Sequence, residues 1–122
     1  MKKEKIILAI DDNLVQLQAY QEYLESKYDI RTVNSASGAI KTLSKIKADV
    51  ILMDIEMPEA SGFELLDEIR KIPDQLNIPV IIISGNSGQD FIEKAGQTSA
   101  FDVLVKPVNK DLLIKTIERA LA

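Results

Sequence analysis

The stretch DVILMDIEMPEASGFEL, residues 49–65, joins a short apolar run to a carboxylate and then to a turn. Val50–Met53 is apolar without polar alternation, which is typical of a strand buried on both faces of a parallel sheet. Asp54 ends this run, and Met57 and Pro58 follow in what we expect to be a loop, because proline fixes φ. The stretch therefore predicts a buried strand that ends on a carboxylate and leads into a turn.

Further runs along the chain have the same character and predict further buried strands at Ile6–Ile10, Val80–Ile83 and Val103–Val105. Ile30–Val33 alternates and predicts an edge strand. Apolar residues at helical spacing lie between the strands. They predict helices from Asn13 to Lys27, from Ser35 or Ser37, over 62–71, over 89–97 and from Asn109. The fold class is α/β, a (βα)5 parallel sheet with helices on both faces.

The bulk composition restricts the chemistry. The 122 residues fit a single domain over 1–122, and they include no cysteine and no histidine. Disulfides, thiolate or imidazole metal sites and histidine-dependent catalysis are therefore excluded, and any metal needs oxygen ligands. The net charge of −4 and the absence of a basic cluster argue against direct nucleic-acid binding. The apolar runs are too short for a membrane span or signal peptide, so we expect a cytoplasmic protein.

Polar residues follow the buried runs directly. They are Asp11 and Asp12 after the first, Asp54 after the next, Ser84 and finally Lys106. Because the carboxyl ends of parallel strands share one edge, we expect these side chains to converge. Clustered carboxylates suit Mg²⁺, with Mn²⁺ as an alternative. A carboxylate can attack phosphorus, while an ammonium and a hydroxyl can stabilise the transferred group.

Each of these residues also has a structural interpretation. Asp11 and Asp12 could form a turn before a helix capped by Asn13, and Asp54 could begin an Asx-turn. Ser84 lies in a turn-like sequence, and Lys106 could be a surface lysine. These interpretations do not explain why every such residue falls at a strand end. Gly62 is expected to provide an unusual backbone conformation before the third helix.

Four short motifs contain these residues: IDDN at 10–13, MDIEMPEASGFEL at 53–65, IIISG at 81–85 and VLVKP at 103–107. With them, the whole chain resembles the receiver domain of two-component response regulators. The resemblance implies a flavodoxin-like fold with strand order 2-1-3-4-5. It implies that Asp54 accepts a phosphoryl group from a phosphohistidine of a sensor histidine kinase or phosphotransfer protein. It also implies that Asp11, Asp12, Asp54 and the Glu56 backbone carbonyl bind Mg²⁺.

The resemblance assigns the remaining positions as well. It implies that Ser84 and Lys106 bind the phosphoryl group, that a cis peptide bond precedes Pro107, and that Glu56 and Asn86 tune hydrolysis of the acyl phosphate. Val103 stands where receivers usually carry a tyrosine or phenylalanine whose rotamer reports phosphorylation. Phe101 is expected to share the side of Val103, because side chains alternate along a strand, and so to replace part of that ring's role.

These features predict a phosphorylation switch rather than a turnover enzyme. The face made by the fourth helix, fifth strand and fifth helix would regulate an unknown effector, and a homodimer is left open. One alternative is a receiver-like interaction module that is not phosphorylated. Another is a Mg²⁺-dependent phosphatase with Asp54 as nucleophile and Glu56 as acid or base. A flavin or nucleotide site is disfavoured, because Asp11 and Asp12 would repel phosphate.

Overall fold

The computed structural model describes residues 5–58, 61–75 and 77–122, and within them strands and helices alternate. The strands are β1 (Ile6–Ile10), β2 (Asp29–Val33), β3 (Val50–Asp54), β4 (Val80–Ser84) and β5 (Asp102–Val105). The helices are α1 (Leu14–Leu24), α2 (Ala36–Leu43), α3 (Gly62–Arg70), a 3₁₀ turn η1 (Pro73–Gln75), α4 (Gln89–Gly96) and α5 (Lys110–Leu121). This alternation confirms the predicted α/β class.

The sheet is parallel with strand order β2-β1-β3-β4-β5, as predicted. Its register aligns the strand ends, since Ile10 pairs with Met53, Asp54 with Ile83, and Ser84 with Val105. The chain order reverses between β1 and β3, where ligands bind in sheets of this type. The carboxyl ends of β1, β3 and β4 therefore meet at one edge.

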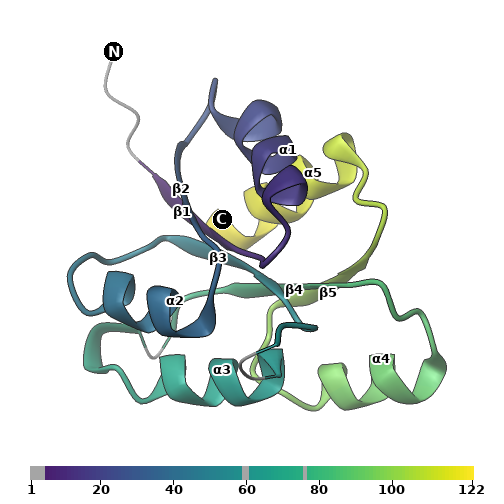
Figure 1. Ribbon diagram of the computed structural model, residues 1–122. Coiled ribbons are helices and arrows are strands. Elements are labelled where there is room, and N and C mark those ends of the chain that lie inside the picture. The colour runs from purple at the N-terminus through teal and green to yellow at the C-terminus, as the bar shows by residue number, and fades with distance from the viewer. Residues whose placement is uncertain (1–4, 59–60, 76) are drawn as a thin grey trace.

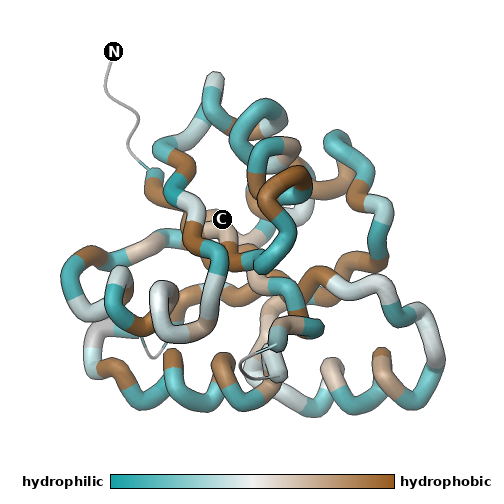
Figure 2. Tube along the Cα trace, viewed as in Figure 1, coloured by the Kyte–Doolittle hydropathy of each residue, from teal (hydrophilic) through white to brown (hydrophobic). Residues whose placement is uncertain are grey.

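The helices form two layers, with α1 and α5 on one side of the sheet and α2, α3 and α4 on the other (Figure 1). Every residue of β3 and β4 is buried. The sheet therefore appears as an apolar centre between helices that carry polar residues outward (Figure 2). No helix in the described ranges combines the length and the hydropathy that crossing a membrane requires.

The structure corrects the end of the first helix, selects one of two predicted starts for the second, and adds a short 3₁₀ turn. Helix α1 ends at Leu24 rather than Lys27, because the Lys27 and Tyr28 amides both donate to the Leu24 carbonyl and turn the chain toward β2. The second helix is capped by Ser35, whose Oγ accepts from the Gly38 amide at 3.0 Å. The 3₁₀ turn η1 was not predicted.

Gly62 is also explained differently. Among the described residues no glycine has a positive φ, so the expected unusual conformation is wrong. A Cβ on Gly62 would instead lie 2.5 Å from Ile55 Cδ1 and 2.7 Å from Ile55 Cα. The glycine is required because the first turn of α3 packs directly on the backbone that leaves β3.

Candidate functional site

The predicted acidic cluster is present at the carboxyl edge of the sheet. Asp11 follows β1 and Asp54 ends the adjacent β3. One carboxylate oxygen from each of Asp11, Asp12 and Asp54 lies within 4.8 Å of the other two. Asp11 is fully buried and Asp54 is 4% exposed, whereas Asp12 is exposed. The cluster therefore has two carboxylates held in the protein interior and one at its rim.

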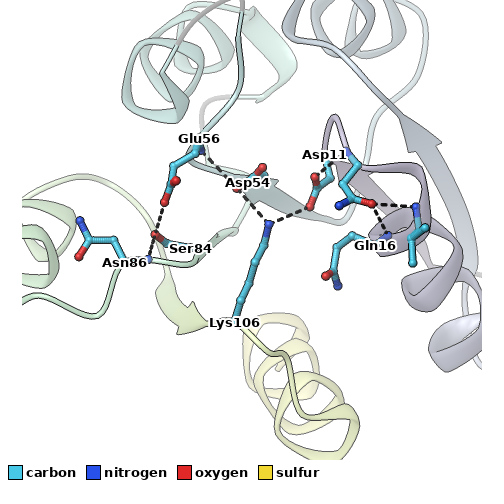
Figure 3. Close-up of polar contacts among 9 residues, drawn as sticks. Asp11, Gln16, Asp54, Glu56, Ser84, Asn86 and Lys106 are labelled. Atoms are coloured by element: carbon cyan, nitrogen blue, oxygen red, sulfur yellow. Dashed lines mark hydrogen bonds and ion pairs between the residues drawn. The ribbon is translucent and has the colours of Figure 1, made fainter.

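Lys106 reaches this cluster from the end of β5 (Figure 3). Its Nζ lies 3.4 Å from Asp11 Oδ2 and 3.5 Å from Asp54 Oδ1. The Lys106 amide donates to the Ser84 carbonyl at 2.7 Å, which fixes its backbone beside β4. The Lys106–Pro107 peptide bond is cis, as the resemblance implied. One ammonium thus faces two buried carboxylates.

The charge of the cluster is not balanced by this lysine. The pKa of Asp54 rises from 3.8 to about 6: burial and the nearby Asp11 charge raise it, while the Glu56 amide and the Lys106 ammonium offset part of that rise. Asp11 Oδ2 is buried and has no hydrogen-bond donor among the described residues, although the Lys106 ammonium faces it at 3.4 Å. A cluster of three carboxylates that shares one ammonium is suited to a hard divalent cation with oxygen ligands.

Ser84 lies on the other side of Asp54 and is fully buried. Its Oγ donates to Glu56 Oε1 at 3.3 Å and accepts from the Asn86 amide at 2.9 Å (Figure 3). The Glu56 amide in turn donates to Asp54 Oδ1 at 3.2 Å. Glu56 and Asn86 are both exposed and both within reach of Ser84, so the predicted tuning positions do flank the site.

Tyr20 adjoins the site and was missed by sequence reasoning. It is 1% exposed, and its hydroxyl has no hydrogen-bond partner in the described structure. Burial raises the pKa of its hydroxyl, and the Asp11 and Asp54 charges add to that rise. In the sequence Tyr20 is one more apolar residue of a helix, so no local signal places its hydroxyl beside the acids.

The expectation for Phe101 is wrong. Val103 is half-buried and packs against the core on the side of α2, α3 and α4. Phe101 precedes β5, is 42% exposed, and has the Arg119 guanidinium of α5 5.6 Å from its ring centre. Alternation does not extend to a residue outside the strand, and the Phe101 ring lies near Arg119 of α5 rather than against the core that Val103 contacts.

Comparison with known proteins identifies the family. Residues 7–118 match the model of the response regulator receiver domain. The chain belongs to this family. Receiver domains are signalling modules that interact with histidine kinases or phosphotransfer proteins and with effectors, and they bind Mg²⁺ at an acidic site.

The similarity extends to individual receivers. The two-component response regulator ORR3 of Oryza sativa is 34% identical over 107 residues, which cover 86% of this chain and 82% of that protein. The chemotaxis protein CheY4 of Vibrio cholerae has a TM-score of 0.90 at 27% identity, covering 96% of this chain and 98% of that chain.

A third receiver structure is described with a metal. The receiver domain of the sensor histidine kinase PA1611 from Pseudomonas aeruginosa has a TM-score of 0.87 at 27% identity, covering 96% of this chain and 97% of that chain. It carries a magnesium ion coordinated in its active site cleft. Other curated relatives at 33–36% identity are much longer, and this chain spans only 18–47% of them.

Proposed function

We propose that this receiver domain is a phosphorylation switch in which Asp54 accepts a phosphoryl group from a phosphohistidine of a sensor histidine kinase or phosphotransfer protein in the cytoplasm. The observation that carries the proposal is the pairing of one ammonium with two buried carboxylates: Lys106 Nζ lies within 3.5 Å of Asp54 and within 3.4 Å of Asp11. Asp54 lies between Asp11 and Ser84 at the switch point of the sheet, where an incoming phosphoryl group has both cationic and hydroxyl contacts.

The residues present fit a divalent cation. Asp11, Asp12, Asp54 and the Glu56 backbone carbonyl would hold Mg²⁺, or Mn²⁺, at this site. Bound there, the metal supplies positive charge for the phosphoryl oxygens and relieves repulsion among the carboxylates. Buried Asp11 Oδ2 supports this assignment, because the Lys106 ammonium that it contacts at 3.4 Å is shared with Asp54, so one positive charge faces two buried carboxylates.

The transfer step uses groups that are already positioned. A carboxylate oxygen of Asp54 forms a bond to phosphorus while the bond from phosphorus to the donor imidazole nitrogen breaks, and the imidazole leaves with the electron pair. The Glu56 amide and Lys106 both contact Asp54 Oδ1 and so orient the carboxylate. Lys106 remains as countercharge for the new acyl phosphate. The Ser84 hydroxyl leaves Glu56 and donates to a phosphoryl oxygen.

Intact mass spectrometry tests this function. The wild type is incubated with Mg²⁺ and acetyl phosphate, beside Asp54→Asn and the exposed control Asp67→Asn. We expect one added phosphoryl group in the wild type and in the control, and none in Asp54→Asn or with excess chelator. Hydroxylamine should remove the group, because it cleaves acyl phosphates and not phosphoserine. Absence of a mass gain in the wild type, or its retention in Asp54→Asn, would refute the assignment.

One observation favours a second candidate, a receiver-like module that binds partners without being phosphorylated. Val103 has no ring with which to report the state of Asp54, and Phe101 lies near Arg119 of α5 rather than beside Val103 in the core. Absence of a mass gain would therefore select this module. The phosphatase alternative finds no such support, since the Glu56 carboxylate contacts Ser84. Multiple turnovers on a phosphomonoester substrate would be the evidence for a phosphatase.

A further inference from the structure

Helix α4 is the most weakly packed helix of the protein. It lies wholly within the described residues and buries one side chain, Ala95, whereas each of the other four α-helices buries at least three. Its N-cap, Gly88, provides no side-chain hydrogen bond. A helix with few buried contacts and an uncapped start shifts at low cost. A change at the nearby acidic site is therefore most readily accommodated by α4.

A chain of hydrogen bonds joins the site to the first turn of this helix. Ser84 Oγ accepts from the Asn86 amide at 2.9 Å, and Asn86 Oδ1 accepts from the Gly88 amide at 2.8 Å. The Gly88 carbonyl then accepts from the Ile92 amide at 3.1 Å, which is the first bond of α4. Movement of the Ser84 hydroxyl changes the first link in this chain and so displaces the helix start.

Helix α3, on the other side of the site, is held firmly. The Gly62 amide donates to the Ile55 carbonyl at 2.8 Å, and a Cβ on Gly62 would overlap Ile55. Ser61 caps the helix through the Glu64 amide at 3.2 Å and pairs with Glu56 in an antiparallel bridge. The start of α3 therefore moves with the rigid end of β3, and α4 can shift relative to it.

An aromatic contact spans these two helices, which are neighbours in the same layer (Figure 1). The ring centres of Phe63 on α3 and Phe91 on α4 are 5.8 Å apart at an interplanar angle of 50°. Lys94, one turn beyond Phe91, places its Nζ 4.6 Å from the centre of the Phe63 ring. Both rings are half-buried and pack against the same core as Val103. The first turns of a fixed helix and a movable one thus meet through two rings.

We propose that the Phe63–Phe91 contact reports the phosphorylation of Asp54 and transmits it to the surface shared by α3 and α4. This inference rests on the proposed function. When the Ser84 hydroxyl turns from Glu56 to the phosphoryl group, the bonds through Asn86 and Gly88 carry the start of α4 with it. The Phe91 ring then moves against Phe63, which stays with β3, and the contact rearranges.

Fluorine NMR tests the relay directly. The chain has three phenylalanines, Phe63, Phe91 and Phe101, so uniform labelling with para-fluorophenylalanine gives three signals. Each signal is assigned by the corresponding change to leucine. Acetyl phosphate is added to protein already saturated with Mg²⁺, and intact mass is followed on the same sample. We expect the Phe63 and Phe91 signals to shift by more than a linewidth and the Phe101 signal to stay.

Two variants distinguish a shift caused by the ring contact from a shift caused by the electric field of the new phosphoryl charge. Asp54→Asn should show no shift at any position. In Phe91→Leu the phosphorylated protein should lose the shift of Phe63, whereas Phe101→Leu, the matched control, should keep it. Persistence of the Phe63 shift in Phe91→Leu would show a through-space effect of the new charge and would overturn the relay. The relay would also be overturned if phosphorylation were complete by mass while the Phe63 and Phe91 signals did not shift, or if only the Phe101 signal shifted. A missing mass gain would overturn the proposed function itself, and the relay with it.

Discussion

Substituting Asp54 by asparagine is expected to stabilise the metal-free protein at neutral and higher pH. The pKa of this carboxyl rises from 3.8 to about 6, with burial as the largest cause. A difference of about two pKa units between folded and unfolded states corresponds to about 2–3 kcal/mol, at roughly 1.4 kcal/mol per unit. Asparagine is close in shape to the protonated acid and carries no charge, so it removes the cost of ionising the buried group.

The pH dependence gives the sign of the effect. Below about pH 4 the carboxyl is protonated in both states, so the substitution should change little. As the pH rises from about 4 to 6, the unfolded state loses its proton while the folded state keeps it, and the wild type loses stability. Above about pH 6 the full penalty is present, and the advantage of Asp54→Asn should reach its maximum.

Urea unfolding followed by circular dichroism measures this difference, in chelator, at several pH values across this range. Asp12→Asn is the matched control, since it makes the same chemical change in the same cluster at an exposed position. The increase in the free energy of unfolding for Asp12→Asn should be less than half the increase for Asp54→Asn. Mg²⁺ at a hundred times the Kd for a single site should stabilise the wild type by about 2.7 kcal/mol and so cancel most or all of the advantage of Asp54→Asn.

Two results would contradict this reasoning. One is an advantage of Asp54→Asn that is equally large below pH 4, because a pH-independent gain cannot come from ionisation. The other is an equal gain in Asp12→Asn, which would assign the effect to overall charge repulsion rather than to burial of Asp54.

Four other substitutions test the packing. Gly62→Ala should lower the free energy of unfolding by about 1–3 kcal/mol through overlap with Ile55, whereas Gly96→Ala, which meets nothing within 4 Å, should raise it by about 0.5–1 kcal/mol; urea titrations measure both. Arg70→Met should cost about 2–4 kcal/mol, because the guanidinium donates to the carbonyls of residues 75, 78 and 99, and hydrogen exchange should show added opening at 99–102. Tyr20→Phe should be neutral or stabilising by up to about 2 kcal/mol in thermal unfolding, since it removes a buried hydroxyl without a partner.

The acidic site could be predicted from the sequence because its residues lie where backbone topology determines position. Each buried run is parallel to the others, so the residue after it must lie at one edge of the sheet. Asp11, Asp54 and Lys106 needed no knowledge of side-chain packing to be placed together. Ser84 followed in the same way, as the last residue of β4. Strand order was available only through the resemblance, since apolar runs do not encode which strand pairs with which.

The features that were missed or misread depend on how elements approach one another. Gly62 shows this, because a close approach between α3 and Ile55 leaves no trace in local composition. Phe101 was misplaced because the strand begins one residue later, and alternation holds only within it. The Tyr20 hydroxyl is exposed to the charges of Asp11 and Asp54 because the side chain packs into the core beneath α1. Each case depends on a tertiary contact, which neither the spacing of apolar residues nor their secondary-structure propensity predicts.

Magnitudes indicate why α4, rather than α3, should respond to phosphorylation. A hydrogen bond from Ser84 to a charged phosphoryl oxygen is worth about 1.5–3 kcal/mol. The ring contact that holds α4 against α3 is worth about 0.5–1.5 kcal/mol beyond its buried area, and the exposed Lys94 adds about 0.5–1 kcal/mol. These quantities are comparable, so one new bond can shift the balance between two positions of α4. Moving α3 would instead disturb Leu65, Leu66 and Ile69, each worth roughly 1.5–3 kcal/mol when buried. One hydrogen bond at the site supplies too little free energy to move α3. We therefore expect phosphorylation to shift α4, which buries one side chain.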